Sequence, residues 1–86
     1  MKIKLIEHAI ERANQRGTTE EEITRVLAEG KEIQAKKGRK AKEMVFNYGK
    51  AWLGRVYTHK KVVAIYKEED GIVVVITIKV YYGEWR

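Results

Sequence analysis

Hydrophobic residues recur with a helical period through residues 4–16. A helical wheel places five apolar side chains on one arc: Leu5, Ile6, Ala9, Ile10 and Ala13. This period of 3.6 residues predicts a half-buried amphipathic helix over residues 4–16. Gly17 is expected to end it, because glycine readily adopts the left-handed conformation at a helix C-terminus.

A second helix is predicted over residues 20–29. Thr19 and Glu22 have the spacing of a capping box, in which each residue's side chain accepts a hydrogen bond from the other's backbone N–H. The acidic residues 20–22 lie at the positive end of the helix dipole, which favours a helix start there. The apolar face consists of Ile23, Val26 and Leu27, and Gly30 follows as the expected end.

After Gly30 the hydrophobic period changes to two, which is typical of strands. The expected order is a weak strand over 31–37, a turn over 38–40, and strands over 43–48, 61–67 and 72–82. A long connection through Trp52 and Tyr57 separates the second strand from the third. Asp70 and Gly71 predict a tight hairpin turn before the last strand.

The last strand has one wholly apolar face, formed by Ile72, Val74, Ile76, Ile78 and Val80. We expect the helices to pack on it and the face with Thr77, Lys79 and Tyr81 to stay open. The predicted fold is therefore α+β, with two N-terminal helices on one face of a mainly antiparallel sheet of about four strands. One domain over residues 1–86 is expected, with the sheet spanning 31–82.

The composition argues against disulfide-bonded, metal-binding and membrane-spanning classes of protein. The 86 residues include no cysteine and two histidines far apart in sequence, so we expect no disulfide, no metal site and no cofactor. The longest apolar run, residues 72–78, is far shorter than the roughly 20 residues of a transmembrane helix. The N-terminus becomes polar before a secretory signal could form. A cytoplasmic protein without a membrane association is expected.

Charge is distributed unevenly along the chain, whose net charge is +6. Residues 1–30 carry five basic and six acidic side chains, whereas residues 36–61 carry nine Lys and Arg and only Glu43 in opposition. Such a basic segment predicts a polyanionic partner, most simply RNA, through phosphate neutralisation. The alternative is that these lysines keep sheet edges soluble, and composition leaves both open.

Aromatic residues are interleaved with this basic segment, a combination suited to stacking on RNA bases. The expected RNA-binding residues are Lys36, Lys37, Arg39, Lys40, Trp52, Arg55, Tyr57, Lys60 and Lys79. In a chain with so small a core, Trp52 and Tyr57 are also candidates for packing. We expect Trp85 to fold back over an end of the sheet.

A basic ridge runs along the first predicted helix, where His8, Arg12 and Arg16 recur every four residues. Like charges at this spacing are mildly unfavourable, so the ridge suggests a function or a tertiary partner. The functional hypothesis is a phosphate held by the two arginines beside an imidazole that transfers a proton. The alternative is that both arginines pair with the acidic residues 20–22 while His8 caps or packs.

Several segments together resemble a known family. They are residues 8–12 (His-Ala-Ile-Glu-Arg), 16–23 (Arg-Gly-Thr-Thr-Glu-Glu-Glu-Ile), 26–27, 30–31, Thr77, and 82–85 (Tyr-Gly-Glu-Trp). The chain resembles the family catalogued as Domain of Unknown Function 4258, which is similar in order of elements to the RelE/ParE and BrnT toxins. The resemblance implies a RelE/ParE-like fold, and its pattern falls on His8, Arg12, Arg16, Gly17 and Thr77. RelE-type ribonucleases rely on basic residues of the sheet and on a late tyrosine or histidine. The resemblance therefore implies Lys60, Lys79, and Tyr81 or Tyr82 as candidates in this chain.

The leading hypothesis is an RNA-binding, RelE-like protein that acts as a metal-independent endoribonuclease toxin of a toxin–antitoxin system. Its catalytic candidates are His8, Arg12, Arg16, Thr77 and Tyr82. The implied partners are RNA, including ribosome-associated mRNA, and an acidic antitoxin protein, and a homodimer stays open. The alternative hypothesis is a non-catalytic protein-interaction domain whose sheet pairs with a partner.

Overall fold

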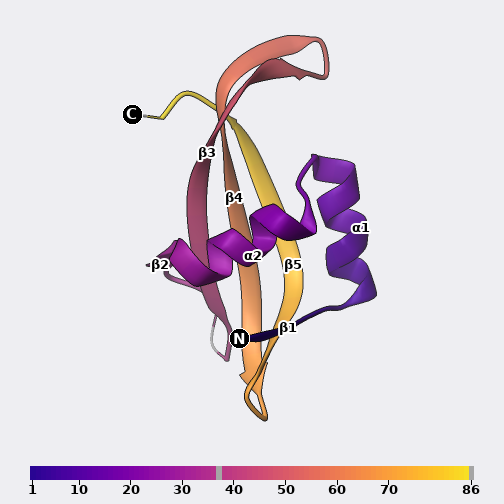
Figure 1. Ribbon diagram of the computed structural model, residues 1–86, viewed down its shortest axis with the longest axis vertical. Helices are drawn as coiled ribbons and strands as arrows, with labels where there is room; N and C mark the ends of the chain where they lie inside the picture. Colours follow the sequence, from indigo (N-terminus) through magenta and orange to yellow (C-terminus); the bar gives the residue numbers. More distant parts are fainter. Residues whose placement is uncertain (37, 86) are drawn as a thin grey trace.

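The chain, described by a computed structural model over residues 1–36 and 38–85, folds as two helices against a five-stranded sheet (Figure 1). Its elements are β1 (Lys2–Leu5), α1 (Glu7–Arg16), α2 (Glu20–Glu29), β2 (Lys31–Ile33), β3 (Lys40–Trp52), β4 (Arg55–Glu69) and β5 (Ile72–Gly83). The strand order is β1-β5-β4-β3-β2, and β1 runs parallel to β5 while the other pairs are antiparallel. The predicted α+β class is confirmed, but the sheet is mixed and has five strands rather than about four antiparallel ones.

The additional strand comes from residues that were expected to begin the first helix. Lys2–Leu5 alternates between exposed and half-buried side chains and pairs with the first residues of β5, from Ile72 to Val75. Helix α1 begins only after Ile6, whose ψ of 160° is extended. The apolar pair Leu5 and Ile6 fits either period, and the edge of β5 decides the outcome by offering hydrogen bonds to β1.

Strands β3 and β4 are much longer than expected and form a single hairpin. The predicted long connection through Trp52 and Tyr57 is wrong, because Trp52 pairs directly with Arg55 across a two-residue turn. The turn residues Leu53 and Gly54 have φ values of 50° and 81°, as a type I′ turn requires. Leucine is a poor residue for that conformation and gives no turn signal.

The predicted turn at Asp70 and Gly71 is confirmed, with φ values of 50° and 75° between the paired residues Glu69 and Ile72. It has the same backbone geometry as the turn between β3 and β4. Aspartate at its first position is a residue that tolerates the left-handed region. Only the turn with a favourable residue could therefore be recognised in advance.

A bulge in β5 changes which of its side chains face the helices. Ile65 pairs with Thr77 but Tyr66 pairs with Val75, so Ile76 is an extra residue. Before the bulge Val73 and Val75 face the helices, and the expected inward positions Ile72 and Val74 are wrong. After the bulge the pattern is as predicted, because Ile78 and Val80 pack inward while Thr77, Lys79 and Tyr81 line the opposite face.

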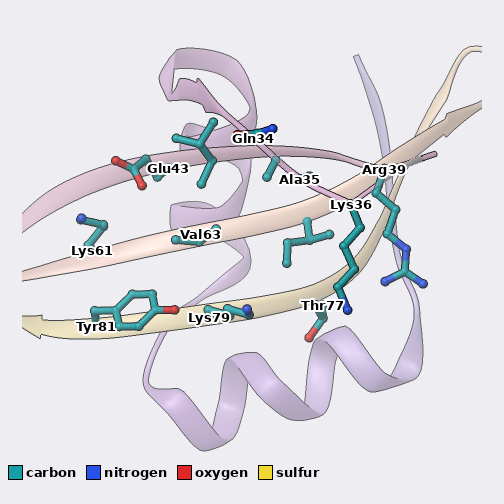
Figure 2. A pocket seen from close by; sticks show the side chains of 13 residues that line it. Gln34, Ala35, Lys36, Arg39, Glu43, Lys61, Val63, Thr77, Lys79 and Tyr81 are labelled. Carbon is teal, nitrogen blue, oxygen red and sulfur yellow. The ribbon is translucent and has the colours of Figure 1, made fainter.

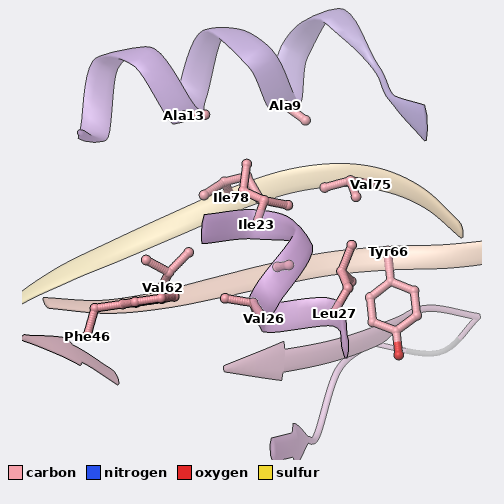
Figure 3. Packing of buried hydrophobic residues seen from close by; sticks show 11 residues of the cluster. Ala9, Ala13, Ile23, Val26, Leu27, Phe46, Val62, Tyr66, Val75 and Ile78 are labelled. Atoms are coloured by element: carbon pink, nitrogen blue, oxygen red, sulfur yellow. The ribbon is translucent and has the colours of Figure 1, made fainter. Parts of the chain in front are cut away.

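The core lies between the helices and one face of the sheet, as Figure 3 shows. Helix α1 contributes only alanines, which allows it to approach β5 closely, whereas α2 contributes larger side chains above β3 and β4. The buried cluster is Ala9, Ala13, Ile23, Val26, Leu27, Phe46, Val62, Ala64, Tyr66, Val75 and Ile78. The predicted capping box of α2 is confirmed by both of its hydrogen bonds.

Candidate nucleic-acid interface

The sheet face turned away from the helices, called the open face below, carries a groove of about 640 Å³ (Figure 2). Its floor consists of cross-strand rows contributed by β3, β4 and β5. Two rows are Ala41–Ile65–Thr77 and Glu43–Val63–Lys79, and Lys61 with Tyr81 forms a third. The segment that follows β2 forms one side, so the groove lies over the centre of the sheet.

Positive charge dominates this groove. Four cations line it, namely Lys36, Arg39, Lys61 and Lys79, and Glu43 is the one carboxylate among the described lining residues. Figure 2 shows Lys36 and Arg39 extending from the segment after β2 toward Thr77 on β5. None of the four cations forms an ion pair with a described carboxylate. They are therefore available to an anionic ligand.

Aromatic side chains lie at one end of the open face. Tyr81 is 50% exposed, a high value for a tyrosine. Trp85 folds back over the sheet as predicted: its backbone N–H donates to His59 Nδ1 at 3.3 Å, and its ring packs on Gly83. The Lys61 ammonium lies 4.9 Å from the centroid of the Trp85 ring, a cation–π contact. The groove thus combines cations with stacking surfaces.

Lys60, an expected RNA-binding residue, belongs instead to the interior on the helix side of the sheet. It is 6% exposed, and its ammonium donates to the Gly17 carbonyl at 2.8 Å and to Glu22 Oε1 at 2.7 Å. The same carboxylate oxygen also accepts from the Thr18 hydroxyl at 2.9 Å and from the Thr19 N–H. Lys60 therefore joins the helix junction to β4.

Tyr82 is the centre of an aromatic cluster beside this ion pair. Its ring stacks on Trp52 with centroids 4.8 Å apart, and Tyr48 and Tyr57 approach it in tilted geometry. Its hydroxyl donates to the Arg16 carbonyl at 2.6 Å. Burial, assisted by the neighbouring Tyr48 and Glu22, raises the pKa of Tyr82 to about 12. Trp52 and Tyr57 therefore pack against Tyr82, which agrees with the alternative that these two residues are needed for packing.

The stability of the fold is expected to fall between about pH 10 and pH 12 because of Tyr82. In the unfolded chain the tyrosine pKa is about 10, so the unfolded state releases this proton first. The contribution is complete below pH 10 and is lost as the pH rises through the folded-state pKa. Tyr82→Phe should flatten this decline in urea titrations from pH 9 to 11.5. Tyr81→Phe, on the open face, should leave the decline unchanged, and equal slopes in the two variants would contradict the assignment.

The basic ridge of α1 meets only one of the other catalytic candidates, Tyr82, whose hydroxyl donates to the Arg16 backbone carbonyl and not to its guanidinium. Arg16 donates to the Ile78 carbonyl at 2.7 Å, where β5 extends beyond β1, and Arg12 donates to Gln15. The alternative, in which both arginines pair with residues 20–22, is wrong: neither arginine forms an ion pair with a described carboxylate, and Glu22 pairs with Lys60 instead. His8 is exposed. Thr77 lines the groove while Tyr82 lies on the helix side, so the five candidates do not converge.

The remaining RNA-binding candidates lie in different parts of the structure. Lys36, Arg39 and Lys79 line the groove. Lys40 instead forms an exposed ion pair with Glu68 at 3.0 Å, whose hydrogen bond raises the lysine pKa. Arg55 lies by the β3–β4 turn over the Tyr57 ring, and Lys37 lies outside the described residues.

Sequence reasoning did not identify Glu43 as part of a site, nor Lys61 as a neighbour of Tyr81. The alternation of Lys61, Val63 and Ile65 does carry a signal, because it places these three side chains on one face of a strand. The pairing register was needed to show that this face is the one with Lys79 and Tyr81.

In the described part of the chain, no group of three or more His, Asp or Glu side chains is placed to hold a metal ion. Neither described helix has the length and apolar character of a membrane span.

The profile of the family described as Domain of unknown function (DUF4258) matches residues 5–80. The chain belongs to this family. The match includes both helices and nearly all of the sheet, so the DUF4258 domain contains the whole groove except Tyr81. No curated protein and no solved structure matches the chain. The family description names no activity.

Proposed function

We propose that this DUF4258 domain binds single-stranded RNA in the groove of the open face. The observation that carries the proposal is the set of four cations, Lys36, Arg39, Lys61 and Lys79, which form no ion pair with a described carboxylate and share one groove with the half-exposed Tyr81. Cations in a groove follow a phosphate backbone, and exposed aromatic rings stack on bases.

Single-stranded RNA fits this arrangement better than a duplex. Neighbouring strands are about 4.8 Å apart, so the three-stranded floor is only about 10 Å wide. Bases in an A-form duplex are stacked on one another and are not free to stack on a protein ring, whereas unpaired bases are. The exposed Tyr81 ring therefore favours a ligand whose bases are not base-paired.

The groove supports binding more directly than cleavage. The described lining residues include no histidine, and His8 and Tyr82 lie on other surfaces. RNA cleavage by a RelE-like toxin would have to use the hydroxyls of Thr77 and Tyr81 and the ammoniums of Lys61 and Lys79 for proton transfer and charge stabilisation. We therefore place binding first, and cleavage is an additional arm of the test. An acidic protein, such as an antitoxin, would be attracted by the same cations.

The test is fluorescence anisotropy with a labelled 12-nucleotide single strand and with the matching duplex. We expect tighter binding of the single strand, and at least a tenfold loss in a Lys61→Glu/Lys79→Glu variant. Each lost phosphate contact should reduce the slope of log K against log salt by about 1. Incubation of labelled mRNA with and without ribosomes, and growth after induction, test for a toxin nuclease.

The matched control is Arg25→Glu/Lys50→Glu, which changes the net charge equally at exposed residues outside the groove. It should retain most of the affinity, and circular dichroism should show that both variants are folded. If both variants lost the same amount of RNA affinity, binding would depend on the overall charge of the chain and not on the groove. Absence of binding would overturn the proposal and favour the non-catalytic protein-interaction domain.

A further inference from the structure

Glu43 is an unexpected residue in this groove. It is half-buried on β3 and lines the groove among four cations, and its carboxylate makes no hydrogen bond or ion pair with any described residue. A carboxylate in a phosphate-binding groove repels the ligand and weakens binding. A residue that reduces general affinity in this way is suited to discriminating between ligands.

The register places Glu43 opposite a cation across an apolar floor. Glu43 pairs with Val63, and Val63 pairs with Lys79, so these three residues form one row across β3, β4 and β5. The outer two backbones are about 10 Å apart, and Val63 is 6% exposed between them. Figure 2 shows the Tyr81 hydroxyl directed along β5 toward Lys79, on the opposite side of the groove from Glu43. The groove, about 640 Å³ in volume and lined by all three residues, has room above this row for a base with one edge toward Glu43.

We propose that the row Glu43–Val63–Lys79 is a nucleotide subsite that selects guanine; the inference rests on the proposed RNA binding. The Glu43 carboxylate accepts hydrogen bonds from guanine N1–H and N2–H, Val63 packs beneath the ring, and Lys79 holds the phosphate. The same row thus reads the base at one wall and positions the backbone at the other.

The choice of guanine follows from hydrogen-bond chemistry. An ionised carboxylate is acceptor-only and forms its strongest contacts with two parallel donors. Guanine presents two adjacent donors on its Watson–Crick edge. Adenine and cytosine present an amine beside an acceptor nitrogen, and uracil presents one N–H between two carbonyls. Each of the latter three places an acceptor against the carboxylate, which is repulsive.

The experiment compares four labelled U-rich single strands that differ only at one central position, which carries G, A, C or U. A single guanine avoids assembly of guanine-rich strands. We expect the G strand to bind the wild-type chain at least tenfold more tightly than the A strand, consistent with a bidentate contact. Inosine at this position, which lacks the N2 amine, should bind with intermediate affinity.

Glu43→Gln should reduce the guanine preference to less than about twofold, because the amide keeps only one acceptor. It should also strengthen binding of the A strand, because the repulsion of phosphate is removed. The matched control is Glu32→Gln, at an exposed carboxylate of β2 outside the groove, which should keep the preference.

Two failures are distinguishable in this design. RNA binding without a base preference, or with a preference that persists in Glu43→Gln, overturns the guanine subsite and leaves the proposed function standing. If none of the four strands binds, both proposals fail together. Equal loss of the preference in Glu43→Gln and Glu32→Gln would also overturn the subsite, since it would reflect charge alone.

Discussion

Glu22→Ala is expected to destabilise the folded chain by about 3–5 kcal/mol, the range found when one partner of a buried ion pair is removed. The substitution leaves the Lys60 ammonium at 6% exposure with only the Gly17 carbonyl as a hydrogen-bond acceptor. It also removes the acceptor of the Thr18 hydroxyl and one half of the capping box. For a chain whose total stability is roughly 5–10 kcal/mol, such a loss brings it close to unfolding.

Removing the lysine of this ion pair should destabilise the fold less than removing the glutamate. Lys60→Met leaves Glu22 with its hydrogen bonds from Thr18 and Thr19, and the Glu22 side chain is 23% exposed, so water can solvate the remaining charge. We expect a loss of about 1–2 kcal/mol, and Lys60→Met should relieve part of the cost of Glu22→Ala in the double variant.

Urea unfolding followed by tryptophan fluorescence and far-UV circular dichroism gives both free energies. The control is Glu21→Ala, which removes an exposed carboxylate from the same helix turn and should cost less than about 1 kcal/mol. If Glu22→Ala were no more damaging than Glu21→Ala, the ion pair would have no structural importance.

Gly17→Ala is expected to destabilise the fold by about 3–4 kcal/mol, combining a backbone penalty with a steric one. Gly17 ends α1 with φ at 80°, where a side chain costs about 1–2 kcal/mol. A Cβ atom there would lie 2.5 Å from the Tyr82 hydroxyl and 2.7 Å from the Trp52 ring. Tyr82 cannot yield without losing its hydrogen bond to the Arg16 carbonyl and its stack on Trp52.

Gly54→Ala is the matched control for this substitution. Gly54 has φ of 81°, and nothing lies within 4 Å of the position that a Cβ would take. It should therefore cost only the backbone penalty of about 1–2 kcal/mol. Thermal and urea unfolding of the two variants measure the difference, and equal losses would show that the aromatic cluster tolerates displacement.

Prediction from the sequence succeeded where the signal is local. The capping box of Thr19 and Glu22, the end of α1 at Gly17 and the turn at Asp70 and Gly71 each depend on residues a few positions apart. These features follow from backbone preferences and short-range hydrogen bonds, which neighbouring residues supply by themselves.

Prediction failed where a distant partner supplies the decisive contact. The chain segment Lys2–Leu5 becomes a strand because β5 offers a parallel edge, and the bulge at Ile76 shifts the inward face of β5 by one residue. A bulge is invisible in an alternating pattern, yet it exchanges the two faces because the side-chain period of a strand is two.

The candidate site shows the same division. The sequence by itself determined that the chain is basic after residue 30, that Lys79 and Tyr81 share a face, and that Lys36 and Arg39 belong to the basic segment. Only the tertiary structure decided which cations remain free, because Lys60 and Lys61 are adjacent in sequence but point to opposite faces of β4. One is buried against Glu22 and the other lines the groove. Strand pairing and helix packing make that distinction, since burial depends on what covers each face rather than on the residue type.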